Sequence, residues 1–539
     1  MKSAKNIIKY EINIGFVILL LITLIIIVRY GLLYFNSDTA CLNVYIREEL
    51  RENSYFPQNW YNGEEILLFT PHTFMLPLVR LGASAYSSRI ICDVVILLML
   101  AVAVYILSCS VFLDSIIAAM AAILVVANYS IAYIVFMDCQ ASYSLILLLC
   151  CVCLIFFFKS MDDELKVQNW LLFIIFIAIN VFCAMLGFRY IQIISIPLLM
   201  AIICVKLIER IYESDEDFDL TRAPAVNTIV LMAGIIVSTG IGYCFFAKIA
   251  SGLIITGPFG GSNALSYIRL TQLDQLDEKF FNAVESYIAL AGYEQGLRLI
   301  SVKTIVILLK CLMFLIMTIV FPVKLAKRYK DISPKIRIFY LFSVFNIFIT
   351  FAILFLSNLT DELGSERYYI VPSFFLWMTG SFFLFYNYKK KPMIQLLAVT
   401  VLVSVLMVNS AGIVHSLNRT ENAVKERYHD VVSTLEKENL SFGYATYWNS
   451  HIYTVYSDFD IEIAPVTVAE GVFAPFRMLS SPKSFEEDYY TKDTFLMLTK
   501  EEDEMFTGRE EILGACKKRI ELDDYIIYVF DHNISGAFT

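Results

Sequence analysis

The sequence predicts a polytopic α-helical membrane protein with a small α/β domain at its C-terminal end. Of the 539 residues, 58% are hydrophobic and 17% are charged, whereas soluble domains usually contain about 25% charged residues. From Ile12 to Gly412 the apolar residues form blocks of roughly 20, the length of a helix that crosses a hydrocarbon core about 30 Å thick. After residue 412 the composition becomes that of a soluble domain. A soluble enzyme, a DNA-binding protein and a disordered scaffold are therefore excluded.

The net charge and the cysteine and histidine content indicate which partners and bound groups to expect. The net charge of −9 is mild for this length and does not favour nucleic acid as a partner. Most of the 12 cysteines lie in or beside apolar blocks, where they act as small apolar core residues. The C-terminal segment contains a single cysteine, Cys516, so we expect no disulfide within it. The few histidines are not paired at metal-ligand spacing, so a zinc site is not expected, although a divalent cation stays an open possibility.

The apolar blocks predict 11 membrane spans. They cover residues 12–35, 88–110, 113–133, 140–158, 170–187, 190–208, 226–248, 302–323, 338–357, 369–387 and 393–412. The first block follows several lysines, as in a signal peptide. It is longer than the apolar region of a signal peptide and has no small-residue cleavage site after it. We therefore expect an uncleaved first helix.

The distribution of basic residues predicts the orientation. With a cytoplasmic N-terminus, the inside segments carry about 17 Lys and Arg in about 63 residues, and the outside loops about 8 in about 122. The protein is then a multi-pass protein of the plasma membrane. Loops 36–87, 251–301 and 358–368 and the tail from residue 413 face outward. The two long outer loops are amphipathic and predict helices that lie on the membrane surface.

We expect two domains, a transmembrane domain at 1–412 and an extracytoplasmic domain at 413–539. The second begins with a charged helical stretch, 418–439. Short apolar runs alternate with helix-like pieces after it, which is typical of a small α/β domain. The expected strands are 441–446, 459–468, 494–499, 518–522 and 525–530.

The first outer loop contains an acid and an aromatic cluster. Asp38 lies just beyond the first span, and Trp60, Tyr61 and His72 belong to a long loop rich in hydrogen-bonding side chains. Such a loop at a membrane surface is suited to gripping a polar headgroup attached to a lipid. Two plainer interpretations stay open: Ser37 or Asp38 is the N-cap of a following helix, and the rings form an interfacial aromatic belt.

Three further sites carry charge at the same predicted face. Glu366, Arg367 and Tyr368 open the tenth span, and an arginine at that depth is a good bidentate partner for a lipid phosphate. Asp138 and Arg189 are lone charges in turns between apolar helices, where charges are costly and usually have a partner or a function. The alternatives are interfacial anchoring for the first group and snorkelling side chains for the other two.

This combination resembles the GT-C membrane glycosyltransferases, which include protein O-mannosyltransferases, lipid A aminoarabinose transferases and oligosaccharyltransferases. The resemblance is carried by Asp38, Asp138, the run Arg-Tyr-Tyr-Ile-Val-Pro at 367–372 and the topology. Bacterial members with Gly-x-Arg at a middle outer turn match residues 187–189. Protein mannosyltransferases carry an Asp-Glu pair where this chain has one acid. The tail shows no motif of the oligosaccharyltransferase type, which argues against transfer to an asparagine sequon.

The resemblance implies a mechanism. The donor is a polyprenyl-phosphate sugar, and the acceptor is a cell-wall polymer, a glycolipid or a protein outside the cytoplasm. Asp38 acts as the general base in an inverting transfer, and Asp138 orients the acceptor or a bound cation. Arg367, helped by Arg189, neutralises the departing lipid phosphate. Metal dependence stays open, since the family contains both kinds.

Three other interpretations compete. A lipid or polysaccharide transporter or flippase would use the same charges, but no internal repeat is found. A polysaccharide ligase or polymerase of another fold usually has one large outer loop late in the chain, whereas the long loops here are first and middle. A receptor with the tail as its sensor is weakened by the lack of a cytoplasmic output domain.

Overall fold

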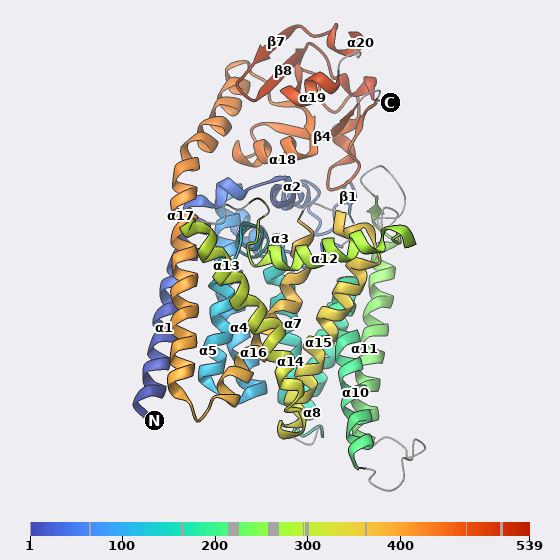
Figure 1. Cartoon of the computed structure of the whole chain (residues 1–539). Helices are drawn as coiled ribbons and strands as arrows, with labels where there is room; N and C mark the ends of the chain where they lie inside the picture. Colours follow the sequence, from blue (N-terminus) through green and yellow to red (C-terminus); the bar gives the residue numbers. More distant parts are fainter. Residues whose placement is uncertain are drawn as a thin grey trace. The chain divides into compact units, whose positions relative to one another are not determined.

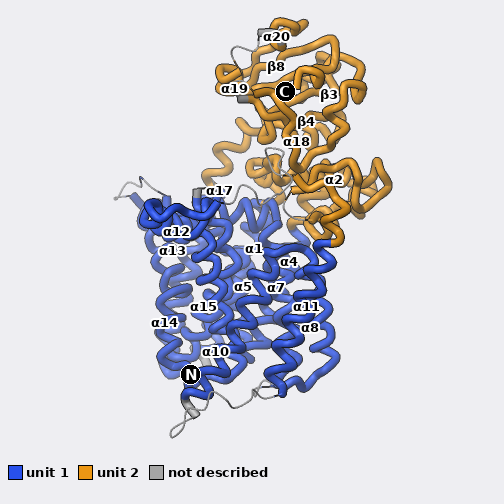
Figure 2. The backbone as a smooth tube through the Cα atoms, turned by 90° about the vertical axis from the view of Figure 1, so that its right-hand side faces the viewer, with its two compact units in different colours: residues 1–26, 94–247, 268–414 blue, residues 27–93, 248–267, 415–539 orange. Residues whose placement is uncertain are grey.

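The structure is a computed structural model that describes residues 2–63, 66–162, 166–213, 226–256, 269–294, 296, 301–361, 364–469, 472–506 and 510–538. It is mostly helical, as the sequence predicts. The chain divides into two compact units, which Figure 2 colours separately. Unit 1 consists of residues 1–26, 94–247 and 268–414, and unit 2 of residues 27–93, 248–267 and 415–539.

Nine helices among the described residues are long and apolar enough to cross a membrane, which indicates a multi-pass membrane protein. The elements that contribute to them, in order, are α1 (Lys2–Ile25), η1 (Ile26–Tyr30), η2 (Gly31–Tyr34), α4 (Ala85–Phe112), α7 (Ser142–Ser160), α9 (Phe188–Tyr190), η5 (Ile191–Ser195), α10 (Ile196–Glu213), α11 (Val226–Ala250), α13 (Val302–Leu315), η8 (Ile316–Val320), α14 (Phe321–Ala326), α15 (Pro334–Phe355), η11 (Ser365–Tyr369), α16 (Ile370–Asn387) and α17 (Pro392–Lys437).

Two of the 11 expected spans differ from a straight long helix. The fifth, α8 (Trp170–Met185), is apolar but has only 16 residues. The third is broken: α5 (Ser115–Ile123) with the turn that follows it, and α6 (Ile131–Tyr133) with η4 (Ile134–Cys139), are bent by 96°. The prediction of a continuous span over 113–133 is therefore wrong.

Buried polar side chains explain the break. Asn128 has a positive φ of 47° and donates to Thr23 Oγ1 of α1 at 2.9 Å and to Ser410 Oγ of α17 at 3.4 Å. The Nδ2 of Asn409 donates to the Asn128 carbonyl at 2.7 Å, and Lys310 donates to the Tyr129 carbonyl. These contacts replace the backbone hydrogen bonds that the unwound segment loses. Such replacement is required because a membrane interior offers no water to bond the exposed backbone groups.

Helix α16 is the most enclosed helix of unit 1. Of its most apolar 18-residue window, 94% is buried, and its Gly380 packs directly on the Met317 carbonyl. Figure 1 shows α7 and α15 beside it. By contrast, α12 (Leu276–Leu290) has an exposed apolar side, with Phe281 69% exposed. That pattern agrees with the surface helix expected in loop 251–301, of which residues 257–268, 295 and 297–300 lie outside the described residues.

The C-terminal part of unit 2 is built on a six-stranded mixed sheet in the order β5-β4-β3-β6-β8-β7. Strand β3 pairs in parallel with β4 and with β6, and the other pairings are antiparallel. The strands are β3 (Phe442–Thr446), β4 (Glu462–Ala469), β5 (Val472–Pro475), β6 (Thr494–Thr499), β7 (Lys518–Glu521) and β8 (Tyr525–Phe530). All five expected strands are confirmed, and the short β5 was not expected.

Side chains alternate between two cores on the faces of this sheet, as strand geometry requires. Phe495 and Met497 of β6 face one core, which also contains residues of α17 and of α18 (Tyr447–Tyr456). Leu496 and Leu498 face the other, with Phe506 after α19 (Lys500–Met505). Figure 1 labels α17, α18 and α19, along with the short α20 (Glu510–Leu513). Other short elements of unit 2 include α3 (His72–Arg80), β1 (Tyr61–Asn62) and β2 (Ile254–Ile255).

In this part of the chain the boundary between the compact units falls after Val414, two residues beyond the expected boundary at residue 412. Helix α17 runs through it without interruption for 46 residues, because Gly412 alone does not end a helix in a strongly helical sequence. The first outer loop also belongs to unit 2. Its helix α2 (Ser37–Glu52) contacts α18 and β4, where Arg47 and Arg51 both pair with Glu462 at 3.0 and 3.1 Å.

Candidate functional site

Asp38 lies in the first turn of α2, and its side chain is exposed. The helix is capped by Asn36, whose Oδ1 accepts a hydrogen bond from the Thr39 N–H at 3.0 Å. Neither Ser37 nor Asp38 is therefore the N-cap. The Oδ1 of Asp38 instead accepts a hydrogen bond from the Tyr447 hydroxyl at 2.7 Å. The positive end of the helix dipole further stabilises the carboxylate at this position.

Tyr447 belongs to the first turn of α18 and is only 6% exposed. Its ring packs against Phe476, with ring centroids 4.7 Å apart, and Ser37 Oγ donates to its carbonyl. Burial, the Cys41 thiol and the Asp38 carboxylate raise the pKa of Tyr447 well above its ordinary value. The phenol therefore keeps its proton and acts as a donor to Asp38.

The aromatic residues expected to bind substrate lie mostly inside the loop. Trp60 and His72 are both 0% exposed, and the Tyr45 ring packs on each of them at 5.3 and 5.2 Å. Tyr61 is half-buried in β1, which pairs in parallel with β2. Trp60 and His72 therefore hold the loop together in this structure and do not line an open surface.

His72 is close to a buried acid that the sequence did not single out. Its Nε2 lies 3.5 Å from Oε1 of Glu49, which is 1% exposed, and its Nδ1 hydrogen-bonds the Thr70 hydroxyl at 2.6 Å. Burial raises the pKa of Glu49 to about 8 and lowers the pKa of His72 to about 3. At neutral pH the two side chains are therefore both uncharged.

In unit 1, two of the expected arginines reach one aromatic pair. The Arg367 guanidinium lies 5.5 Å from the ring centroid of Phe136, and the Arg189 guanidinium 5.6 Å from that of Tyr143. The two rings meet edge to face at 5.9 Å. Arg367 also donates to the Tyr368 hydroxyl at 3.2 Å. Stacking on aromatic faces is a property of guanidinium groups that orients them without neutralising their charge.

The remaining expected residues of unit 1 flank this cluster in the sequence. Glu366 and Tyr368 lie on either side of Arg367 in η11, and both are half-buried. Gly364 begins this turn with φ of 81°, and a Cβ there would lie 3.1 Å from the Phe136 ring and 3.3 Å from Arg367 Nη1. A glycine is therefore needed where the turn approaches the arginine.

The position of Asp138 in the structure differs from the one that the sequence predicts. The residue lies in the π-helical segment η4 and is 0% exposed, rather than in an outer turn. The helix reaches it because the broken third span resumes at residue 131. Asp138 follows Phe136 by two residues, so it belongs to the segment that supports the two arginines. Its burial does not support a direct contact with an acceptor.

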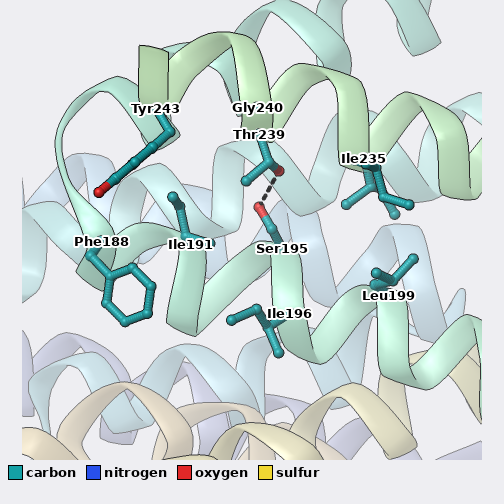
Figure 3. Close-up of a pocket in the computed structure, with 10 residues that line it drawn as sticks. Phe188, Ile191, Ser195, Ile196, Leu199, Ile235, Thr239, Gly240 and Tyr243 are labelled. Atoms are coloured by element: carbon teal, nitrogen blue, oxygen red, sulfur yellow. Dashed lines mark hydrogen bonds between the residues drawn. The ribbon is translucent and has the colours of Figure 1, made fainter. Parts of the chain in front are cut away.

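An apolar pocket of about 420 Å³ lies between the segment 188–199 and α11. Figure 3 shows its residues, with the Thr239 hydroxyl donating to Ser195 at 2.9 Å. Asn180 of α8 bonds both hydroxyls, which fixes the pocket floor. The lining residues are Phe188, Ile191, Ser195, Ile196, Leu199, Ile235, Ile236, Thr239, Gly240 and Tyr243. Phe188 at one end directly precedes Arg189.

The described residues contain no group of three or more His, Cys, Asp or Glu side chains arranged to hold a metal ion. These residues therefore offer no set of ligands for the divalent cation that the sequence left possible.

Sequence reasoning missed several residues of these sites. Nothing in the sequence linked Tyr447 to Asp38, 409 residues away. Phe136 and Tyr143 are indistinguishable from other aromatic residues at span ends. Glu49 is one of many charges in an amphipathic helix, and neither its burial nor its closeness to His72 is visible in the sequence.

Comparison with known proteins identifies no family for this chain. No protein-family model matches the chain, and no curated protein matches it either.

Proposed function

We propose that the chain is a membrane glycosyltransferase that moves a sugar from a polyprenyl-phosphate donor to a hydroxyl of an extracytoplasmic glycan, lipid or protein. The observation that carries the proposal is the exposed Asp38 carboxylate, held by the buried Tyr447 hydroxyl at 2.7 Å. An acid that is exposed and also oriented by a permanent donor is suited to remove a proton from a bound hydroxyl.

The arginines of unit 1 supply the complementary chemistry. Arg367 lies over the Phe136 ring and Arg189 over the Tyr143 ring, and these two rings pack against each other. Two guanidinium groups suit the phosphate of a lipid donor, because each can bind its oxygens in a bidentate manner. The apolar pocket that starts at Phe188 suits the hydrocarbon part of such a lipid.

The proposed step balances as a substitution at the anomeric carbon. The acceptor oxygen forms a bond to that carbon while its proton passes to Asp38. The bond between the carbon and the phosphate oxygen breaks, and the electron pair leaves with the polyprenyl phosphate. Arg367, with Arg189, stabilises the charge that develops on the phosphate. The anomeric configuration inverts because a single displacement takes place.

A donor screen tests this proposal. Purified full-length protein is offered a panel of polyprenyl-phosphate sugars, and the release of polyprenyl phosphate is measured. Release from at least one donor, accelerated by a hydroxyl-bearing acceptor, is expected. A protein that releases polyprenyl phosphate from none of them is not this enzyme.

A lipid or polysaccharide transporter is the second candidate, and the bent third span favours it. Broken helices with buried polar side chains, like Asn128 beside Lys310, often form transport sites. Proteoliposomes loaded with a fluorescent polyprenyl-phosphate sugar separate the two functions. Movement of the intact lipid across the bilayer supports transport, whereas cleavage of the sugar supports transfer.

A further inference from the structure

The tyrosine that bonds Asp38 lies among aromatic side chains of the C-terminal part of the chain. Trp448 follows Tyr447 in α18 and is 58% exposed. Its ring meets the Tyr447 ring edge to face at 5.2 Å. Phe476, after β5, packs on the same tyrosine and is itself half-buried. The side chain that bonds Asp38 thus has an exposed indole on one side and a partly exposed phenyl ring against it.

The chemistry of the proposed step places the acceptor at this surface. A general base must lie within hydrogen-bond reach of the hydroxyl that it deprotonates. The group bearing that hydroxyl therefore contacts whatever surrounds Asp38. An exposed indole offers an apolar face with a polar N–H edge. A sugar ring fits such a surface, since it has C–H groups on its faces and hydroxyls around its rim.

We propose that the first turn of α18 is the acceptor-binding wall of the site: Tyr447 is a positioning residue for Asp38, and Trp448 binds a sugar ring of a carbohydrate acceptor. This inference rests on the proposed function and deepens it by naming the acceptor class. It assigns a role to a C-terminal segment for which the sequence indicated none.

Tyr447 positions Asp38 in two ways. The hydrogen bond from its hydroxyl orients the Asp38 carboxylate, and the same bond stabilises the charged form of the base. The Cys41 thiol also lies near Asp38, donating to its carbonyl at 3.0 Å, and Arg89 acts electrostatically on that thiol. Since Tyr447 keeps its proton, the positioning contact persists across the working pH range.

The first test compares Tyr447→Phe with Tyr456→Phe, which removes a hydroxyl from the far end of the same helix. Loss of a hydrogen bond to a charged group predicts a kcat lowered roughly 10- to 100-fold in Tyr447→Phe. The acid limb of its pH profile moves to higher pH, because the carboxylate loses a stabilising donor. Tyr456→Phe keeps the wild-type values. An unchanged kcat and pH profile in Tyr447→Phe overturns the positioning role.

The second test measures transfer from the donor that the wild type turns over to two probes, a soluble hexose disaccharide and a serine-containing hexapeptide. Wild type is expected to glycosylate the disaccharide. Trp448→Ala raises the KM for the disaccharide at least about 10-fold and leaves the donor KM unchanged. Trp170→Ala, which changes a tryptophan of similar exposure, 55%, is the control for a general membrane-anchoring effect.

The outcomes separate this proposal from the proposed function. Donor turnover with transfer to the peptide alone keeps the enzyme and overturns the carbohydrate class. Equal disaccharide KM values for wild type and Trp448→Ala overturn the role of the indole. Equal losses in Trp448→Ala and Trp170→Ala assign both tryptophans to membrane anchoring. Absence of donor turnover in the wild type overturns the proposed function and this inference with it.

Discussion

The Nζ of Lys310 lies 2.9 Å from the Oδ1 of Asn409, in the interior of unit 1. Both side chains are at most 9% exposed. Both also bond the unwound segment of the third span: Lys310 donates to the Tyr129 carbonyl, and Asn409 donates to the Asn128 carbonyl. Gly292 makes room for this contact, since a Cβ there would overlap the Lys310 ammonium. The pair therefore holds the break that precedes Asp138.

Asn409→Leu is expected to destabilise the protein by at least about 2 kcal/mol, because the buried ammonium loses one of its two acceptors and the Asn128 carbonyl loses its donor. Lys310→Met combined with Asn409→Leu recovers part of this loss, since the ammonium is then removed as well. Thermal unfolding of the full chain in detergent measures both effects. Val408→Leu, at a 53% exposed position of the same helix, is the control. Additive effects of the two changes would contradict the pairing.

Arg367→Lys is expected to raise the KM for the lipid donor about 10-fold while the protein stays folded. Lysine keeps the charge but loses the planar stacking on Phe136 and the bidentate geometry toward phosphate. Donor kinetics at fixed acceptor concentration measure the change. Arg328→Lys, at a 56% exposed side chain outside this cluster, is the matched control. A donor KM equal to that of wild type would remove Arg367 from phosphate binding.

Because Glu49 is buried, we expect the stability of the folded protein to depend on pH. The pKa of Glu49 is raised to about 8 by burial in the folded protein, whereas an unfolded glutamate titrates near about 4.3. Unfolding therefore releases a proton between these values, and stability falls as pH rises. His72, with a folded pKa of about 3, acts oppositely, but only below its unfolded pKa of about 6.5. The window from about pH 6.5 to 8 thus contains the contribution of Glu49 but not that of His72.

In that window, wild type is expected to lose about 2 kcal/mol of stability more than Glu49→Gln. The glutamine carries no titratable proton and keeps the shape of the side chain. Thermal unfolding of both proteins at several pH values measures the difference. Parallel pH dependences would mean that Glu49 is ionised in the folded protein.

Glu462→Gln is expected to lower the stability by about 3–5 kcal/mol, because Arg47 and Arg51 lose a largely buried partner. Burial acts to raise the pKa of Glu462, but these two guanidinium groups outweigh it and hold the pKa below its ordinary value. Glu521→Gln removes a carboxylate that is 57% exposed and pairs with Arg519. Calorimetry should show a much smaller effect for this control, and equal effects would contradict the account of the α2 attachment.

The sequence predicted most of the fold because its patterns are local. Blocks of about 20 apolar residues mark membrane helices, and the five expected strands were marked by short apolar runs between turns. The broken third span was missed since Asn128 and Ser130 interrupt an otherwise apolar run too briefly to show. Helix α17 was divided at residue 412 because composition changes there although helix propensity does not.

The candidate site was predictable only in part. Asp38, Arg189 and Arg367 stand out as charges at the ends of apolar segments. Their partners do not, because Tyr447, Phe136 and Tyr143 become special only through contacts between distant segments. Burial is likewise invisible in the sequence, and it changes the interpretation of Trp60 and His72 from surface residues to interior ones.

The most direct test of the central claim compares wild type with Asp38→Asn in the release of polyprenyl phosphate from the donor found by screening. Asparagine keeps a hydrogen-bond acceptor for Tyr447 but cannot accept the proton of the acceptor hydroxyl. A folded Asp38→Asn protein that loses turnover by roughly 10²–10⁴-fold is the predicted result. Turnover equal to that of wild type would show that Asp38 is not the base.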